Sequence, residues 1–313
     1  MPRAAFDLGQ SETRALVVGD DGRAEEFRLE AFRYGEDVPS ALLRLVRTLG
    51  ERTGHSTFDA CAFGSTGLHG RVPDPQVLAE QLWEQYAIST VRIADDALTS
   101  HLGAFAGRSG VLAAVGTGLV VLGVGPDRVA RVDGYGPTIG DDGAGWWIGR
   151  QGVIAAMRAH DGRRGGSEGA LREVQRAFGP IENFSARVAS VDSPTALIAT
   201  FAPSVAGLAR EGDAVARRVW AEAGRIVGDA VCAAARRSGL ETSFEWSVVG
   251  GIAQASDLLL PSLEQTVLTE YPSATRVTSR GTSLDGAVRL LHLDGADIER
   301  FAPLVRSFTR GTQ

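Results

Sequence analysis

The chain of 313 residues contains no lysine, and its 32 basic residues are all arginine. P-loop kinases and protein kinases place a lysine on the nucleotide phosphates. The usual forms of both classes are therefore excluded. Any phosphate site in this chain must depend on backbone N–H groups, on a metal ion or on arginine.

The chain also lacks a long apolar run and has few cysteines. No segment is apolar over the length that spans a bilayer, and residues 1–7 are too few for a signal peptide before the first expected strand. We therefore expect a cytoplasmic protein with no membrane partner. The two cysteines, Cys61 and Cys232, lie far apart in apolar contexts. Their spacing is typical of buried free thiols, not of a zinc or redox motif.

Positive charge is scattered rather than concentrated. The net charge is −6, and no stretch forms a basic stripe. This distribution argues against a nucleic-acid partner. With 44% hydrophobic residues, a chain of this length can bury two moderate cores, so we expect two domains.

Glycine is abundant, and the richest cluster lies at the centre of the chain. Residues 134–149 read Gly-Tyr-Gly-Pro-Thr-Ile-Gly-Asp-Asp-Gly-Ala-Gly-Trp-Trp-Ile-Gly. Two adjacent carboxylates, Asp141 and Asp142, thus precede a helix expected over Trp146 to Met157. Glycines allow close backbone approach, and N–H groups at a helix start favour a polar or anionic group. The stretch is predicted to be a ligand-binding loop.

One order of elements occurs twice along the chain: a three-strand meander, a helix, a strand, and then a strand followed by a helix. In the first half we expect strands and helices at Arg3–Leu8, Thr13–Val18, Ala24–Glu30, Pro39–Thr53, Phe58–Phe63, Val91–Ala94 and Asp96–Phe105. In the second half we expect them at Val111–Val115, Leu119–Val124, Arg128–Val132, Ala214–Arg237, Phe244–Val249, Thr275–Thr278 and Ser283–Leu293. The pattern predicts an α/β protein with a mixed, helix-covered sheet in each domain.

The second half contains additional helices. Ser167–Phe178 and Ser193–Glu211 form a predicted helical insertion. The long helix that follows has apolar residues at three- and four-residue steps, so its apolar stripe faces a core. Asp213 is its predicted N-cap and Gly239 its predicted stop.

The first hairpin loop of each half is rich in glycine and hydroxyl groups. The loop of the first half contains Gly9, Gln10 and Ser11 and is followed by Thr13; the loop of the second is Gly116-Thr117-Gly118. Main-chain N–H groups in such tight turns bind anions. Together the two hairpins predict a phosphate clamp without lysine. Asp7, beside the first loop, is a carboxylate suited to Mg²⁺, directly or through water.

These motifs resemble the N-acetylglucosamine kinase and benzoyl-CoA reductase activator type of ATPase, within the actin-like sugar kinase superfamily. The resemblance covers nearly the whole chain. The residues that carry it are Asp7-Leu-Gly-Gln-Ser-Glu-Thr13, Asp95-Asp96-Ala97, Gly116-Thr-Gly118, the loop Gly134–Gly143, Phe201-Ala-Pro-Ser-Val205, Gly212-Asp213 and Val249-Gly-Gly251. It implies two ribonuclease-H-like domains with an active-site cleft between them. The first would comprise residues 1–107 with C-terminal helices from about 286 to 313, and the larger second one residues 108–285.

The resemblance places Asp96 as the base that takes the proton from the sugar hydroxyl during attack on the γ-phosphate. Its position after the strand Val91–Ala94 agrees with this, since open α/β sheets present ligands at such strand ends. Asp95 is the alternative base. A pair of adjacent acids is also common at helix N-caps, which is the structural alternative for both residues.

The resemblance also implies a substrate and nucleotide set. Asp141 would bind sugar hydroxyls, Gly116, Thr117 and Gly118 would approach the sugar or the phosphate, and Gly250 and Gly251 would accommodate the adenosine. Tyr135 stands where tryptophan is common, Asp142 where glutamate is common, and Leu119 where serine is expected. The segment Tyr34 to Asp37 lacks the asparagine that N-acetylglucosamine kinases place against the sugar. Glu36 or Asp37 could there favour a free amine over an acetamide.

The function that the resemblance implies is ATP- and Mg²⁺-dependent phosphorylation of an amino-sugar hydroxyl, foremost N-acetylglucosamine to its 6-phosphate. Glucosamine or another amino sugar is an alternative acceptor. Two alternatives belong to other classes: an activator ATPase with an iron–sulfur cluster on cysteine thiolates, and a non-enzymatic sugar sensor. The sensor would need a DNA-binding segment, whereas the first expected strand begins within a few residues of Met1. The sequence indicates no oligomeric state; a homodimer is the assembly to consider first, because dimers are the commonest soluble homo-oligomers.

Overall fold

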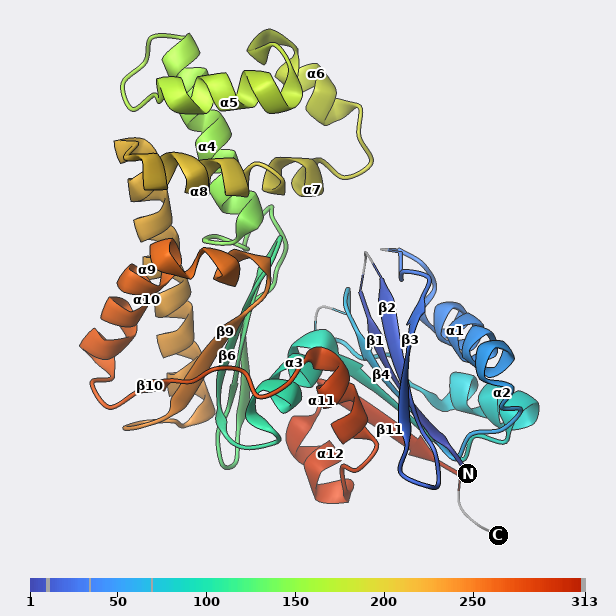
Figure 1. Cartoon of the computed structure of the whole chain (residues 1–313). Coiled ribbons are helices and arrows are strands. Elements are labelled where there is room, and N and C mark those ends of the chain that lie inside the picture. The colour runs from blue at the N-terminus through green and yellow to red at the C-terminus, as the bar shows by residue number, and fades with distance from the viewer. Residues whose placement is uncertain (10–11, 34, 69, 311–313) are drawn as a thin grey trace. The chain divides into compact units, whose positions relative to one another are not determined.

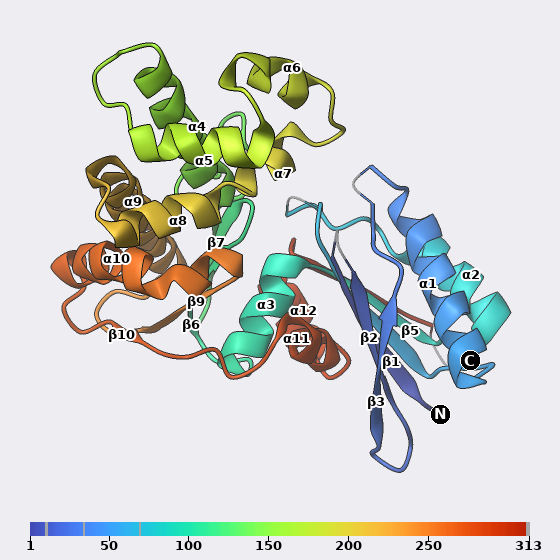
Figure 2. The same ribbon diagram turned by 45° about the horizontal axis from the view of Figure 1, so that its top comes forward.

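The structure, a computed structural model, describes residues 1–9, 12–33, 35–68 and 70–310. The chain divides into two compact α/β units (Figures 1 and 2). The first contains the residues up to Ser109 and those from Thr278 onward, and the second contains nearly all of the residues between them. The predicted fold class, mixed sheets covered by helices, is confirmed.

The sheet of the first unit has the strand order β3-β2-β1-β4-β5-β11. Its strands are β1 (Arg3–Leu8), β2 (Thr13–Val18), β3 (Ala24–Leu29), β4 (Ala60–Ser65), β5 (Thr90–Asp95) and β11 (Val305–Thr309). The first three strands pair antiparallel, β4 and β5 run parallel to β1, and β11 closes the edge antiparallel to β5. Phe6 of β1 and Phe63 of β4 stack within the core, with ring centroids 4.8 Å apart.

Helices cover both faces of this sheet (Figure 1). On one face lie α1 (Val38–Thr53) and α2 (Gln76–Tyr86); on the other lie α3 (Asp96–Phe105), α11 (Ser283–Leu290) and α12 (Gly295–Phe301). Apolar residues on α1 recur at three- and four-residue steps and are fully buried, as at Leu42, Leu45, Val46 and Leu49. This stripe holds the helix on the sheet.

The sheet of the second unit repeats the first topology with the order β8-β7-β6-β9-β10. Its strands are β6 (Gly110–Val115), β7 (Leu119–Val124), β8 (Val129–Asp133), β9 (Glu245–Val249) and β10 (Thr275–Arg276). Here too the hairpin β6–β7 is antiparallel, and β9 runs parallel to β6. The predicted duplication is therefore visible strand by strand.

The helices of the second unit form its larger part. They are α4 (Gly145–His160), α5 (Glu168–Phe178), α6 (Phe184–Ala189), α7 (Pro194–Ala199), α8 (Ala202–Glu211), α9 (Ala214–Ser238) and α10 (Ser256–Glu270), with short 3₁₀ turns at Ile181–Asn183 and Gly251–Ala255. In the described part of the chain no helix is both long and apolar enough to cross a membrane.

Several elements differ from the expectation. The single helix expected over Ser193–Glu211 is two helices, because the chain breaks at Thr200 and restarts with Pro203 in the first turn of α8. The helix expected to end at Leu293 ends at Leu290 and belongs to the first unit. The elements α2, α10 and β11 were not predicted; α12 falls within the region of C-terminal helices expected from about 286 to 313.

The ends of α9 confirm the predicted caps. The Asp213 carboxylate accepts the N–H groups of Val215 and Ala216, both at 2.9 Å, and Gly239 is left-handed at φ 78°. The Ser167 hydroxyl donates to the other carboxylate oxygen of Asp213 at 2.6 Å. Burial alone would raise the pKa of Asp213, but these hydrogen bonds outweigh it and hold the pKa below 3.8.

We therefore expect Asp213→Ala to lower the free energy of unfolding by about 1–2 kcal/mol, measured by urea denaturation at pH 7. Asp213→Asn keeps an acceptor but loses the charge. A depressed pKa contributes its full stability above the unfolded pKa and loses it as the pH falls through the lower folded pKa. The gap between wild type and Asp213→Asn should therefore narrow progressively as the pH falls below about 4. Asp192→Ala, at an exposed aspartate, is the matched control; equal losses for both alanine variants would contradict the assignment.

Candidate active site

The two adjacent acids at the end of β5 have different surroundings. Asp95 is 1% exposed and is the N-cap of α3. One of its carboxylate oxygens accepts the N–H of Ala97 at 3.1 Å, and the other accepts the N–H of Gly70 at 2.8 Å. Both oxygens of Asp95 are thus bound to the backbone, which is the arrangement of a structural cap.

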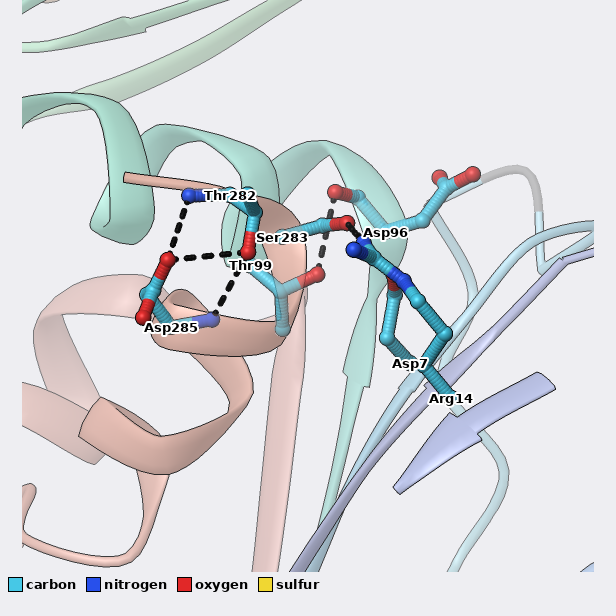
Figure 3. Close-up of polar contacts among 7 residues, drawn as sticks. All are labelled: Asp7, Arg14, Asp96, Thr99, Thr282, Ser283 and Asp285. Atoms are coloured by element: carbon cyan, nitrogen blue, oxygen red, sulfur yellow. Dashed lines mark hydrogen bonds and ion pairs between the residues drawn. The ribbon is translucent and has the colours of Figure 1, made fainter. Parts of the chain in front are cut away.

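Asp96 is the first residue of α3 and is only half-buried. Its backbone carbonyl accepts the Thr99 hydroxyl at 3.1 Å, and its side chain extends away from the helix (Figure 3). A carboxylate in the first helical turn is also favoured by the helix dipole in its charged form. Of the two acids, Asp96 is the one whose position suits a base.

Asp7 lies at the end of β1, where two side chains bind the same carboxylate oxygen. Arg14 Nη2 and Ser283 Oγ each lie 2.6 Å from Asp7 Oδ2, and Arg14 Nη2 lies 3.3 Å from Ser283 Oγ (Figure 3). Arg14 faces Asp7 because the two residues are cross-strand partners in the β1–β2 hairpin. Ser283 comes from the first turn of α11, at the other end of the sequence.

Close helix packing sets the position of Ser283. A Cβ atom on Gly286 of α11 would overlap the carbonyl oxygen of Thr99, and one on Gly103 of α3 would overlap that of Thr282. The two backbones therefore approach as closely as only glycine permits. Thr282 and Asp285 form a capping box at the start of α11 (Figure 3), which fixes the turn that carries Ser283.

The first predicted phosphate hairpin is only partly described. The N–H of Gly9 donates to the carbonyl of Glu12 at 3.1 Å, and a Cβ on Gly9 would lie 2.8 Å from that oxygen, so the turn needs glycine. Gln10 and Ser11 lie outside the described residues. Thr13 is fully buried in β2, and its hydroxyl has no partner among the described residues.

Asp7 is the predicted magnesium ligand. No group of three or more metal-binding side chains occurs in the described ranges. A single carboxylate nevertheless suits Mg²⁺ that arrives on a nucleotide, because this ion keeps several waters and takes one or two carboxylates besides the phosphates. The site residues therefore fit a nucleotide-borne magnesium ion, and they do not form a protein cage for one.

Glu36 and Asp37, the predicted contacts for the amino group, both have protein partners. Asp37 is the N-cap of α1 and accepts the N–H of Ser40 at 3.0 Å. Glu36 binds Arg44 Nη2 at 2.8 Å, and this hydrogen bond holds the pKa of Glu36 below its ordinary value. These partners account for both carboxylates without a sugar amine.

The second hairpin is joined to the start of α4. The N–H of Gly145 donates to the carbonyl of Gly116 at 2.9 Å, and that of Trp146 donates to the carbonyl of Thr117 at 3.0 Å. Gly118 is needed because the Asp141 carboxylate lies 2.7–2.9 Å from where its Cβ would stand. The loop 134–143 thus lies directly against the hairpin.

Asp141 is held in a left-handed conformation at φ 63° and is 7% exposed. Its Oδ1 accepts the N–H of Leu119 at 3.1 Å, and its own N–H donates to Asp133 Oδ1 at 3.0 Å. Asp133 is also left-handed, at φ 59°, and the Arg131 guanidinium binds the carbonyls of Asp133 and Gly134. The sequence analysis missed Asp133 and Arg131; the residue pair Asp133-Gly134 before a glycine-rich loop is a turn signal that could have pointed to them.

The remaining predicted residues of the second unit differ in exposure. Tyr135, on the loop, is 65% exposed. Gly250 has φ 102°, and a Cβ there would lie 2.5 Å from the carbonyl oxygen of Val115, whereas Gly251 begins a 3₁₀ turn with open space beside it. The structure thus places Asp7 and Asp96 in the first unit, and Asp141, the Gly116–Gly118 hairpin and Gly250 in the second.

Comparison with solved structures shows the fold of a sugar kinase. A candidate N-acetylglucosamine kinase from Chromobacterium violaceum matches with a TM-score of 0.72 and 25% identity, over 93% of this chain and 98% of that one. A glucokinase of the ROK family from Streptomyces griseus, solved with glucose and AMPPNP, matches with a TM-score of 0.57 and 18% identity, over 93% and 99% of the chains. The predicted fold, two domains of the actin-like sugar kinase type, is confirmed.

The family follows from the sequence itself. The model of the BadF/BadG/BcrA/BcrD ATPase family matches residues 6–288, and the chain belongs to this family. A curated relative, the N-acetylmuramic acid/N-acetylglucosamine kinase of Clostridium acetobutylicum, is 23% identical over 261 residues, which is 81% of this chain and 84% of that protein. The resemblance that the motifs indicated is confirmed.

The surroundings of the two acids predict unequal losses of stability when each is replaced by alanine. Asp95→Ala leaves two backbone N–H groups without their acceptor, so we expect a loss of about 2–3 kcal/mol in the free energy of unfolding. Asp96 is the first helical residue and not the N-cap, so we expect Asp96→Ala to cost less than about 1 kcal/mol. Urea denaturation of both variants measures the difference, and a larger loss for Asp96→Ala would refute it.

Proposed function

We propose that this protein is an ATP-dependent kinase of an amino sugar, with N-acetylglucosamine as the first acceptor to test and its 6-phosphate as the product. The observation that carries the proposal is Asp96: a half-buried carboxylate at the start of α3, beside a neighbour whose oxygens are both occupied by the backbone. The relatives named as amino-sugar kinases support the choice of acceptor.

In this proposal Asp96 accepts the proton of the sugar hydroxyl as the hydroxyl oxygen attacks the γ-phosphorus. A bond forms between that oxygen and phosphorus, the bond from phosphorus to the β–γ bridging oxygen breaks, and ADP leaves. Phosphoryl transfer depends on positioning and charge stabilisation more than on covalent chemistry. The glycine-rich hairpins at Gly9 and at Gly116–Gly118 would supply backbone N–H groups to the phosphates.

Asp7 would hold magnesium that is bound to ATP, most readily through water, and the ion would neutralise charge on the phosphates. Asp141, in the second unit, would bind sugar hydroxyls. Gly250 and Gly251 would accommodate the adenosine beside Val115. These roles are the ones that the family resemblance implies, and the surroundings of each residue are compatible with its role.

The activator function within the same family is less well supported. An iron–sulfur cluster needs cysteine thiolates at an accessible interface. Cys61 is fully buried in β4, and burial raises the pKa of its thiol far above the ordinary value. Cys232 is buried in α9, where burial and the charges of Glu270 and Asp229 raise its pKa to about 12. Neither thiol is prepared to ligate a metal cluster.

The proposal predicts sugar-dependent ADP release by the purified protein with Mg²⁺ and ATP. The acceptors to compare are N-acetylglucosamine, glucosamine, N-acetylmannosamine, N-acetylmuramic acid and glucose, with a reaction without sugar. Asp96→Asn should lower kcat by about 10²–10⁴-fold, since it removes a general base. Asp127→Asn, at an exposed turn, is the matched control. Sugar-independent hydrolysis, or no hydrolysis at all, would overturn the kinase proposal. Sugar-dependent turnover that survives in Asp96→Asn would overturn the role of Asp96 as the base.

The same panel tests the role of Glu36 and Asp37. Because both carboxylates already bind Arg44 or the start of α1, we expect N-acetylglucosamine to have a kcat/KM at least equal to that of glucosamine. A strong preference for glucosamine that disappears in Glu36→Gln would show instead that the Glu36 carboxylate binds the sugar's free amine.

A further inference from the structure

The guanidinium of Arg14, which keeps its positive charge at all ordinary pH values, binds one oxygen of the Asp7 carboxylate. Arg14 Nη2 lies 2.6 Å from Asp7 Oδ2, and the two side chains are 29% and 14% exposed. A partly buried ion pair at this distance is screened much less than a surface pair. The residue proposed to attract a divalent ion therefore already has a fixed positive neighbour.

Local structure holds Arg14 in this place. It faces Asp7 in the register of the β1–β2 hairpin, and on its other side it faces Arg28 of β3. Arg28 directs its guanidinium elsewhere, to Glu12 at 3.4 Å, and is 77% exposed. Two arginines thus lie side by side on the sheet, and only Arg14 contacts Asp7.

Ser283 completes the arrangement from the far end of the chain. Its hydroxyl donates to the same Oδ2, and it is placed by the capping box of α11 and by the glycine contact between α3 and α11. In the described part of the chain the contacts of Asp7 thus fall on Oδ2. The carboxylate is held through Oδ2. In the proposed nucleotide site, Oδ1 would then be the oxygen for a metal-bound water.

We propose that Arg14 and Ser283 are positioning residues of the active site: they orient Asp7 through Oδ2, and Arg14 limits how strongly Asp7 attracts magnesium. This inference rests on the proposed nucleotide site. Its consequence is that Asp7 favours a magnesium ion that arrives with ATP and is held through water, and that the metal and ADP are released after transfer instead of staying bound to the carboxylate.

The sign of the effect follows from charge. Removing the positive charge of Arg14 leaves the carboxylate unopposed, so a divalent ion beside it is bound more tightly. The same change weakens binding of the metal-free nucleotide, because one cation near its phosphates is lost. Both effects raise the ratio of nucleotide Kd without Mg²⁺ to nucleotide Kd with Mg²⁺. We expect a rise of about three- to tenfold for a single charge near a divalent ion at physiological salt.

The experiment is calorimetric titration of a nonhydrolysable ATP analogue into the full-length protein, with Mg²⁺ and with EDTA. The variants are Arg14→Gln, Arg14→Lys, Asp7→Asn and the double variant Asp7→Asn/Arg14→Gln. Arg28→Gln is the matched control, because it removes the same charge from the neighbouring cross-strand position without touching Asp7. Thermal unfolding checks that each variant is folded.

The proposal requires a higher ratio in Arg14→Gln, and a ratio near that of wild type in Arg14→Lys and Arg28→Gln. It also requires that the Arg14→Gln effect largely disappear in the Asp7→Asn background, because the residue acts through Asp7. An unchanged ratio in Arg14→Gln, or an equal effect with and without Asp7, overturns it. If Arg14→Gln does not fold, Asp7→Asn is compared with the double variant, in which no carboxylate is left unpaired. A threefold difference in the Kd ratio between these two variants refutes the proposal.

Ser283→Ala separates positioning from charge. It removes a neutral hydroxyl, so the ratio should stay within twofold of wild type while kcat falls and the KM for the sugar is unchanged. A change in the ratio as large as that of Arg14→Gln would contradict this division of roles. The binding ratio does not depend on turnover, so absence of sugar phosphorylation with an intact ratio pattern would refute the proposed acceptor and leave the inference on Arg14 standing.

Discussion

The contact between α3 and α11 is the constraint on which the first unit's site depends. Gly103 and Gly286 let the two helix backbones approach so closely that any side chain at either position would overlap a carbonyl oxygen of the other helix. Because α3 begins with Asp96 and the first turn of α11 carries Ser283, this contact sets the positions of two residues of the proposed site at once. Thr99, fully buried at the crossing, ties the arrangement to the backbone of Asp96. Through Ser283 the same contact reaches Asp7 on the sheet.

In the second unit, strained backbone has the corresponding role. Asp133 and Asp141 both adopt left-handed conformations, which cost on the order of 1–3 kcal/mol each for residues other than glycine. The hydrogen bonds from Arg131 to the loop carbonyls, and between the Asp141 N–H and Asp133, offset that cost. These hydrogen bonds hold the Asp141 carboxylate in contact with Gly118 and with the N–H of Leu119. A loop that must present backbone and carboxylate together is thereby held in one conformation.

The sequence predicted the features that depend on local patterns of residues. The duplicated order of strands, the caps Asp213 and Gly239 and the helix Asp96–Phe105 follow from periodicity and capping residues, and the structure shows them. It did not predict α10, whose helical pattern is interrupted by Pro261, or β11, a short edge strand whose place is set only by pairing with β5. The Ser283–Asp7 contact joins residues 276 positions apart, and no local pattern records such a contact. Gly286 likewise looks like any helix glycine until its neighbour is known.

The pair Asp95-Asp96 shows where sequence reasoning stops and what geometry adds. Two identical side chains in adjacent positions have the same intrinsic chemistry, so only their partners can separate them. Asp95 ends a strand with its carboxylate turned back to two N–H groups, which commits both of its oxygens. Asp96, one residue later, is within the helix and directs its side chain outward. The cap thus holds the backbone that carries Asp96, the proposed base. In the same unit of a chain without lysine, the Asp7 carboxylate is paired with an arginine from the neighbouring strand.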